Sequence, residues 1–266
     1  MLKGSYHNGF APRDGIPLYP SLWRGCVGAW APCLGPTGVT LRDWSAYKNH
    51  GTLTNMDPGT DFVLSGGPYS LDFDGTNDYV TVPDASQLNF TDWQLTVSCW
   101  ANIRSVSLFP YLITKSGSNT THHYGLAVNN SQHRFLVGGS EVNESYTPTS
   151  GVWVHYAGTC NGTTMSLYRN GALRATGTRT LTQTYSGALT FGTLFWNNNY
   201  VNGQIDDIRI YNRALNANEI AVLASRRGIA YDLAPMVMPY SEQVAGFNAA
   251  WVLRQRLILG GGGGMG

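Results

Sequence analysis

The chain has 266 residues, a formal net charge of +1 at pH 7, and charged side chains at only 12% of its positions. This balance argues against partners that are selected by bulk charge, such as nucleic acids and anionic membrane surfaces. Its apolar runs are too short to span a bilayer, so we expect no membrane insertion. The length suits one β-sandwich with an extension at each end.

The N-terminal residues are expected to form an extended arm. Residues 1–21 are rich in glycine, proline and tyrosine and have little hydrophobic periodicity. They lack the apolar segment that a secretory signal peptide needs. We therefore expect the protein to reach a virion or another extracellular surface assembly by lysis or by assembly into a particle.

From Trp23 onward, short apolar segments alternate with turn residues, as in an all-β domain. A hairpin turn is expected at Asn170 and Gly171, because both positions accept a positive φ. About a dozen short strands at regular spacing predict two antiparallel sheets packed face to face. The main expected strands before the last one are 26–30, 70–73, 79–82, 95–101, 111–114, 124–128, 134–137, 153–159, 165–169 and 189–192.

The last expected strand lies within residues 203–211. Ile208 and Ile210 point to one face of this extended segment and Arg209 points to the other. This period-two alternation predicts a half-buried strand. We expect Ile208 and Ile210 to be buried and Arg209 to face solvent.

A short helix is expected directly after this strand. Asn216 can cap the helix, and Glu219 follows three residues later, as a capping box requires. Ile220 and Leu223 then continue at helical spacing. The sequence therefore predicts one helix that begins near Asn216 and closes the sandwich.

Four stretches of the chain resemble, in the same order, the laminin-G-like, concanavalin A-like jelly-roll domains of bacterial and viral proteins. The resemblance extends over residues 22–226 and implies an all-β, two-sheet antiparallel jelly-roll sandwich with one short C-terminal helix and extended terminal arms. It places Trp100 and Trp153 at strand positions, so we expect both in the core. The fold hosts lectins, glycosidases and structural modules alike. The four stretches are 43–53, 70–80, 151–159 and 203–220.

The tail, residues 227–266, differs in composition from the sandwich. It carries an apolar stretch around Trp251 and ends in a glycine-rich segment over 260–266. Apolar side chains that a free domain would expose usually mark an interaction surface. We expect the arm and the tail to dock on other protein subunits.

One loop has the composition of a carbohydrate-binding site. Trp196, Asn197, Asn198 and Tyr200 combine aromatic faces with amide groups, and His122 could lie nearby. Sugars stack on aromatic rings and form hydrogen bonds with amides. The alternative is an ordinary surface loop with Trp196 folded onto the core.

Three polar residues are candidates for a structural calcium site. Asp43, Asn49 and Asp206 supply the carboxylate and amide oxygens that calcium prefers. The resemblance implies such a site, because related domains often carry calcium between the early polar turn and the final strand. The alternative is turn chemistry, in which these side chains bond to nearby backbone.

No catalytic constellation is visible. Asp72 and Asp74 would share one strand face, as a glycosidase pair could, but the same turn recurs in family members without known catalysis. Glu141 and Glu144 should face opposite sides of a strand. We therefore expect no enzyme activity.

The sequence favours a non-catalytic interaction or structural protein, a lectin-like module displayed on a virion or similar assembly as a decoration or fibre protein. Cell-surface glycans are possible partners of such a module. The alternatives are a free carbohydrate-binding module and a glycoside hydrolase.

Overall fold

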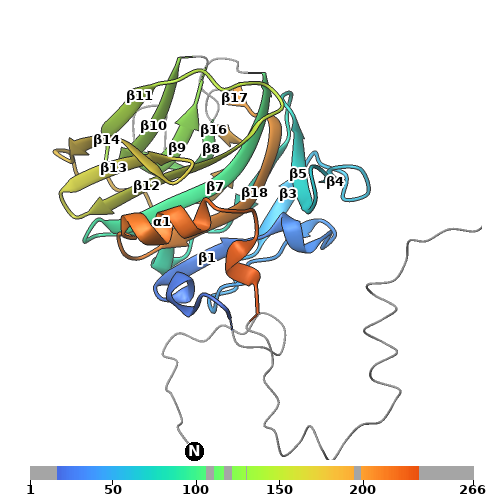
Figure 1. Cartoon of the computed structure of the whole chain (residues 1–266), viewed down its shortest axis with the longest axis horizontal. Coiled ribbons are helices and arrows are strands. Elements are labelled where there is room, and N and C mark those ends of the chain that lie inside the picture. The colour runs from blue at the N-terminus through green and yellow to red at the C-terminus, as the bar shows by residue number, and fades with distance from the viewer. Residues whose placement is uncertain (1–16, 106–110, 117–121, 130, 195–198, 234–266) are drawn as a thin grey trace, which may run out of the picture. The chain divides into compact units, whose positions relative to one another are not determined.

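The computed structural model of the chain describes residues 17–105, 111–116, 122–129, 131–194 and 199–233. This part is a sandwich of two antiparallel sheets with one short α-helix (Figure 1). The all-β, two-sheet sandwich predicted from the sequence is confirmed. None of the helices in the described ranges is long and apolar enough to cross a membrane. Most of the expected arm and tail lies outside the described residues.

Sheet I has the strand order β14-β13-β12-β7-β18-β5-β4, and β1 also pairs with β18. Strands β5 and β1 divide one edge of β18 between them, because β5 pairs with residues 202–205 and β1 with residues 208–211. The strands of sheet I are β1 (Cys26–Trp30), β4 (Phe62–Leu64), β5 (Tyr69–Asp74), β7 (Gln94–Ser105), β12 (Trp153–Asn161), β13 (Thr164–Arg169), β14 (Ala172–Thr178) and β18 (Asn202–Tyr211).

Sheet II has the order β11-β10-β9-β8-β15-β6-β3-β2. Its strands are β2 (Thr40–Leu41), β3 (Gly51–Thr54), β6 (Tyr79–Val82), β8 (Tyr111–Ser116), β9 (His122–Val128), β10 (Gln132–Val137), β11 (Ser140–Ser145) and β15 (Leu189–Phe191). Two further short strands, β16 (Thr193–Leu194) and β17 (Asn199–Tyr200), pair with each other. The 3-10 helices are η1 (Pro20–Trp23), η2 (Pro32–Leu34), η3 (Ser86–Leu88) and η4 (Ile229–Tyr231).

The main core lies between the two sheets. Ile208 and Ile210 are fully buried in it, as the alternation of the sequence predicts. Trp30 of β1 meets Phe191 of β15 edge-on, with 4.9 Å between ring centroids. Residues that are far apart in the sequence therefore pack together in the same core.

A second buried layer covers the outer face of sheet I. Its apolar members include Leu22, Trp23, Ala29, Tyr211, Ile220, Leu223, Ala230 and Tyr231. They come from η1, β1, β18, η4 and the helix α1 (Ala217–Leu223), which lies across this face (Figure 1). The packed region thus extends beyond Arg226, and an isolated bridge joins Pro17 to Leu233.

This second layer overturns one prediction. Arg209 is 0% exposed, so the expectation that it faces solvent is wrong. Its guanidinium lies 4.7 Å from the ring centroid of Trp23 and 4.5 Å from that of Tyr231. The alternation in β18 is real, but both faces of the strand are covered.

Two tryptophans expected in the core lie elsewhere. Trp100 and Trp153 are only half-buried. The Trp100 indole donates a hydrogen bond to the carbonyl of Leu223 in α1, at 3.2 Å. The guanidinium of Arg227 lies 4.0 Å from the Trp153 ring centroid. Both rings therefore support the outer layer of sheet I.

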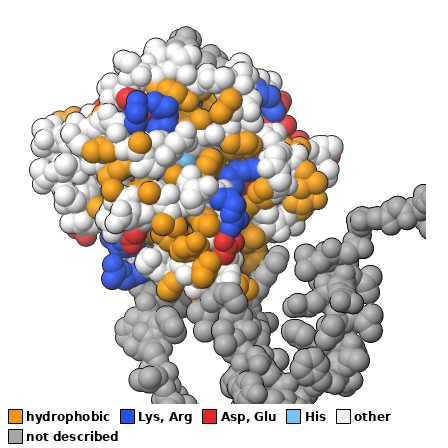
Figure 2. Space-filling view, viewed as in Figure 1, with side chains coloured by type: hydrophobic (Ala, Val, Ile, Leu, Met, Phe, Trp, Pro, Cys, Tyr) orange, Lys and Arg blue, Asp and Glu red, His pale blue; other side chains and the backbone are white. Residues whose placement is uncertain are grey.

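The local predictions for the helix and the hairpin are confirmed. Helix α1 starts after Asn216, whose side chain accepts a hydrogen bond from the Glu219 amide, while the Glu219 side chain accepts one from the Asn216 amide. Asn170 and Gly171 have φ values of 50° and 79° between β13 and β14. On the face that carries α1, most of the surface is uncharged (Figure 2).

Candidate functional site

A pocket with a volume of about 210 Å³ opens on the outer face of sheet II. Its lining combines hydroxyl-bearing side chains with an aromatic and an aliphatic wall. The lining residues are Thr81, Thr114, Ser116, Tyr185, Ala188, Thr190 and Leu194. The helix α1, η1 and η4 all pack against the other sheet and leave this face uncovered by helices.

Three threonines on adjacent strands form the floor of the pocket. Thr190 of β15 pairs directly with Thr81 of β6 on one side and with Thr114 of β8 on the other. Residues paired in this way share one face of a sheet. Their neighbours along the strands, such as Val80 and Leu189, are buried in the main core, so the threonines point outward.

The hydroxyl of Thr114 is the unusual feature of this floor. Thr114 is 2% exposed, and its Oγ1 has no hydrogen-bond partner among the described residues. The Thr190 hydroxyl, in contrast, lies 3.4 Å from the Thr114 carbonyl oxygen and 3.3 Å from the Thr193 carbonyl oxygen, and can donate to either. A buried polar group without a partner costs about 1–3 kcal/mol. A ligand hydroxyl at this position would remove that cost.

Two buried basic side chains hold the loop that forms the Tyr185 wall. The Lys115 ammonium donates to Asp84 Oδ1 at 2.6 Å and to the carbonyl of Gly187. The His123 ring lies 3.3 Å from the Tyr185 amide nitrogen. Burial, together with the nearby Lys115 charge, lowers the pKa of His123 to about 4, so the ring is neutral at pH 7. Neither side chain lines the pocket.

An aromatic stack borders the pocket. The Tyr111 ring lies parallel to the His122 ring, with 5.5 Å between centroids and 12° between planes. It reaches there across Gly125, where a Cβ atom would lie 3.3 Å from Tyr111 Cδ1. His122 of β9 is the cross-strand partner of Ser116 of β8, which lines the pocket. This residue, predicted from the sequence, therefore lies beside the pocket.

The other residues of the predicted carbohydrate site divide into two groups. Tyr200 is half-buried, and its ring lies 6.4 Å from that of Tyr79, which is on the same face of β6 as Thr81. Trp196, Asn197 and Asn198 lie outside the described residues. Two of the five predicted side chains are therefore placed on the outer face of sheet II.

Sequence reasoning missed the three threonines of the floor. Each sits at an outward position of a strand, which alternation with buried residues can indicate. Their meeting depends on pairing between strands that are far apart in the sequence, and no local signal reports that pairing.

The carboxylate of Asp43 does not fit a calcium ligand. Its Oδ1 accepts from the amides of Ala29 at 2.9 Å and Ser45 at 2.8 Å. Its Oδ2 accepts from the Ser45 hydroxyl at 2.8 Å and the Asn49 amide at 2.7 Å. A carboxylate has about four acceptor sites. All four are used to fix the polar turn against β1.

The other predicted calcium ligands are also engaged. Asn49 Oδ1 accepts from the Gln87 amide group at 2.7 Å. Asp206 belongs to a separate network, described next. No group of three or more His, Cys, Asp or Glu side chains in the described part of the chain could hold a metal ion. The calcium site stays a prediction, and this geometry argues against it.

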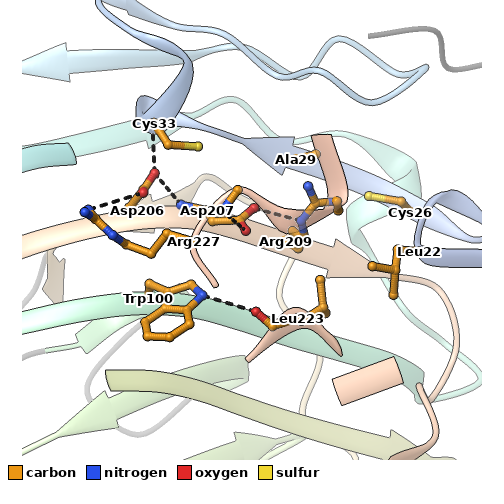
Figure 3. A network of polar contacts seen from close by, with 12 residues as sticks. Leu22, Cys26, Ala29, Cys33, Trp100, Asp206, Asp207, Arg209, Leu223 and Arg227 are labelled. Carbon is orange, nitrogen blue, oxygen red and sulfur yellow. Dashed lines mark hydrogen bonds and ion pairs between the residues drawn. The ribbon is translucent and has the colours of Figure 1, made fainter. Parts of the chain in front are cut away.

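Asp206 lies in a buried polar network on the outer face of sheet I (Figure 3). Its Oδ1 accepts from the amides of Cys33 at 2.9 Å and Asp207 at 2.7 Å. Arg227 Nη1 lies 3.6 Å from its Oδ2. Burial, and then the Asp207 charge, raise the pKa of Asp206 to about 7. These contacts tie η2 and the segment after α1 to β18.

Asp207 completes the network beside a β-bulge in β18. Its φ is 45°, and the register of β18 with β7 shifts between Asp206 and Arg209. The bulge allows the consecutive carboxylates of Asp206 and Asp207 both to face the outer layer of sheet I and to bond to its residues. Asp207 Oδ1 accepts from Arg209 Nε at 2.8 Å, and Oδ2 accepts from the Gly228 amide at 3.0 Å.

The acidic residues considered for catalysis have structural partners. Asp72 forms an ion pair with Arg104, and Asp74 Oδ1 accepts from the Thr76 amide at 2.7 Å. Glu141 is exposed and Glu144 is buried, so they face opposite sides of β11, as predicted. Glu144 bonds to three basic side chains, those of His133, Arg169 and Arg174. The absence of catalysis stays a prediction.

Three solved structures illustrate what the fold resembles. The binding domain of Paraclostridial Mosquitocidal Protein 1 has a TM-score of 0.59 and 16% identity, over 76% of this chain and 52% of that one. Domain 4 of AbnA, a GH43 extracellular arabinanase from Geobacillus stearothermophilus, was solved in complex with arabinotriose. It has a TM-score of 0.60 and 16% identity, over 75% of this chain and 98% of that one. Trypanosoma rangeli sialidase in complex with the inhibitor DANA has a TM-score of 0.58 and 19% identity, over 75% of this chain and 32% of that one.

These similarities concern the fold alone, given the low identities. The chain spans about half of the mosquitocidal binding domain and about a third of the sialidase. No curated protein sequence matches it. The model of the concanavalin A-like lectin/glucanases superfamily matches residues 74–221, more than half of the 266 residues, and this protein therefore belongs to that superfamily.

Proposed function

We propose that this protein is a non-catalytic glycan-binding module that takes one neutral sugar unit into the pocket on sheet II. The observation that carries the proposal is Thr114, a pocket-lining residue whose buried hydroxyl has no hydrogen-bond partner among the described residues. A sugar hydroxyl both donates and accepts, so it can satisfy this group and its neighbours together.

The chemistry of the lining selects a neutral ligand. Four hydroxyl-bearing residues, Thr81, Thr114, Ser116 and Thr190, meet one aromatic ring, Tyr185, and no charged side chain lines the pocket. A carboxylated sugar would lose its hydration there without gaining a counter-charge. The volume of about 210 Å³ is below the roughly 300–1,000 Å³ of sites for drug-sized ligands. It therefore suits a single small unit.

The relatives support this proposal by analogy of fold. One similar structure is an arabinanase domain in complex with arabinotriose, and nearly all of that domain is covered. Others are sialidases, of which this chain covers about a third. A shared fold does not transfer activity. The support for binding comes from the pocket, and the absence of catalysis rests on the structural engagement of the acidic residues.

Calorimetric titration with neutral sugars tests the proposal. The panel is arabinose, glucose, xylose, galactose and mannose, each as a series from one to five units, alongside an array of immobilised neutral glycans. We expect Thr114→Val to weaken binding about tenfold, as loss of one buried hydrogen bond implies. The matched control is Thr176→Val, since Thr176 is exposed on β14 of the other sheet. Absence of binding to every panel member and array position would overturn the proposal.

Display of the module on a virion or similar assembly is the second part of the proposal. It rests on the apolar tail sequence around Trp251, in residues that the structure does not describe. Light scattering of the full chain and of a form that ends at Leu233 tests it. Assembly that needs residues 234–266 supports display, and a full-length monomer counts against it.

A further inference from the structure

The threonine floor of the pocket continues well beyond the pocket. Thr81 pairs with Thr52 of β3, and Thr52 pairs with Thr40 of β2. Together with Thr190 and Thr114 they form one row, in which each threonine stands directly opposite the next. We call these five residues the threonine row. It crosses β8, β15, β6, β3 and β2 at right angles to the strands.

The row has the dimensions of a short oligosaccharide. Neighbouring strands lie about 4.8 Å apart, so the four intervals of the row span roughly 19 Å. One interval is close to the length of a single sugar ring. Beyond the pocket, a glycan chain that crossed the strands would therefore advance by about one strand per unit.

Exposure changes steadily along the row. Thr40 and Thr52 are exposed, Thr81 is half-buried, and Thr190 and Thr114 are buried in the pocket. The surface is thus open at the β2 end and deepens toward β8. A ligand that extends out of the pocket can follow the row in this direction.

The opposite direction is closed. The residue after Thr114 in the same row is Gly125 of β9. Gly125 has no side chain, and the Tyr111 ring lies over this glycine and stacks on His122. Tyr111 also packs in a cluster with Leu136 and Leu194. The pocket is therefore the end of the path.

An aromatic wall runs along the open part of the row. Tyr79 lies two residues before Thr81 on the same face of β6, and its ring lies 6.4 Å from that of Tyr200. Such rings bury large apolar area and keep a polar hydroxyl at their tips, which suits the mixed surface of a sugar chain.

We infer that the glycan is a linear chain that binds by one terminus: its last unit fills the pocket over β8, β15 and β6, and the following units continue along the threonine row across β3 toward β2. This inference rests on the proposed function and adds the direction and the length of the ligand. Cross-strand threonine pairs also stabilise sheets by themselves. That role does not require a pocket at one end or a buried Thr114 hydroxyl without a partner.

The same panel of neutral sugars, from one to five units, tests the inference. We expect affinity to rise with each unit up to about three, because two intervals of the row lie beyond the pocket residue Thr81. Thr52→Val should lower affinity for chains of four or five units about three- to tenfold and leave binding of single sugars unchanged. Thr52 is exposed, and valine is favourable in strands, so this variant should fold.

The outcomes separate the inference from the proposed function. Absence of binding to any sugar overturns both. If a single sugar binds as tightly as the five-unit chain, or if Thr52→Val binds long chains like the wild type, the chain does not follow the row and the inference fails alone. Equal binding of maltohexaose and of cyclic α-cyclodextrin, which has no terminus, would also overturn terminal recognition. Thr176→Val again serves as the unaffected control.

Discussion

Replacement of Asp207 by Asn tests whether the buried network holds the second layer of the sandwich together. Asp207 forms an ion pair with the Arg209 guanidinium and accepts a hydrogen bond from its Nε at 2.8 Å. Arg209 is 0% exposed and is held between Trp23 and Tyr231. Asparagine keeps the shape of the side chain and tolerates the φ of 45° at this position.

The expected loss of stability is large. A buried ion pair that loses one partner leaves an uncompensated charge, at a cost of about 3–5 kcal/mol. One of the two Asp207 oxygens becomes an amide group, so either Arg209 or the Gly228 amide loses its acceptor, which adds about 1 kcal/mol. The total of about 4–6 kcal/mol is a large part of the roughly 5–15 kcal/mol that stabilises a typical domain.

Urea unfolding followed by tryptophan fluorescence measures this loss. The matched control is Asp232→Ala, which breaks the surface pair of Asp232 with Arg226, with side-chain exposures of 33% and 55%. Such a pair contributes about 0–1 kcal/mol. The double variant Asp207→Asn with Arg209→Met should recover much of the loss, since it removes the orphaned charge. A loss below about 1 kcal/mol in Asp207→Asn would refute the reasoning.

Three further predictions concern pH, metal and the chain end. Because the folded state raises the pKa of Asp206 to about 7, the folded protein binds more protons than the unfolded chain between about pH 4 and pH 7, and the Asp206 contribution to stability falls as pH rises through this window. Asp206→Asn should therefore gain stability relative to wild type as pH rises from 4 to 8 in urea titrations, and a pH-independent difference would contradict this. Chelation by EDTA should leave the melting temperature unchanged while Asp43→Ala lowers it, because four protein donors occupy that carboxylate; a lower melting temperature in EDTA would restore the calcium site. A chain that ends at Leu233 should melt like the full chain, whereas one that ends at Arg226 should melt lower because it lacks Tyr231 of the second layer; equal melting of the two would show that residues 227–233 contribute nothing.

Local signals in the sequence predicted the local structure well. The capping box of Asn216 and Glu219 and the hairpin at Asn170 and Gly171 depend on residues within a few positions of each other. The family motifs correctly predicted the two-sheet sandwich. The alternation of apolar and polar residues correctly predicted that Ile208 is buried. For the helix cap, the hairpin and the alternation, the physical cause lies within one segment of the chain.

The errors have a common origin in long-range packing. Alternation in β18 could not show that η1 and η4, from opposite ends of the chain, cover Arg209. Trp100 was assigned to the core because the family resemblance places it at a strand position, yet it lies under α1. The threonine row depends on pairing among five strands that the sequence separates. These features are properties of the assembled sheets.

The division of one edge of β18 between β5 and β1 has a consequence for how the protein is made. Strand β1 leaves the ribosome early, yet its partners, residues 208–211, belong to β18, the last strand of the sandwich. Roughly 180 residues must be translated between Trp30 and Ile208, which takes roughly 10–40 s at typical rates of synthesis. During that time the edge of β1 has no native partner, and the sandwich cannot close. Its ends nevertheless meet, since Pro17 bridges to Leu233. A circular permutant that joins these ends would synthesise β18 and β1 in succession and replace the longest-range strand pairing of the described sandwich by a local one.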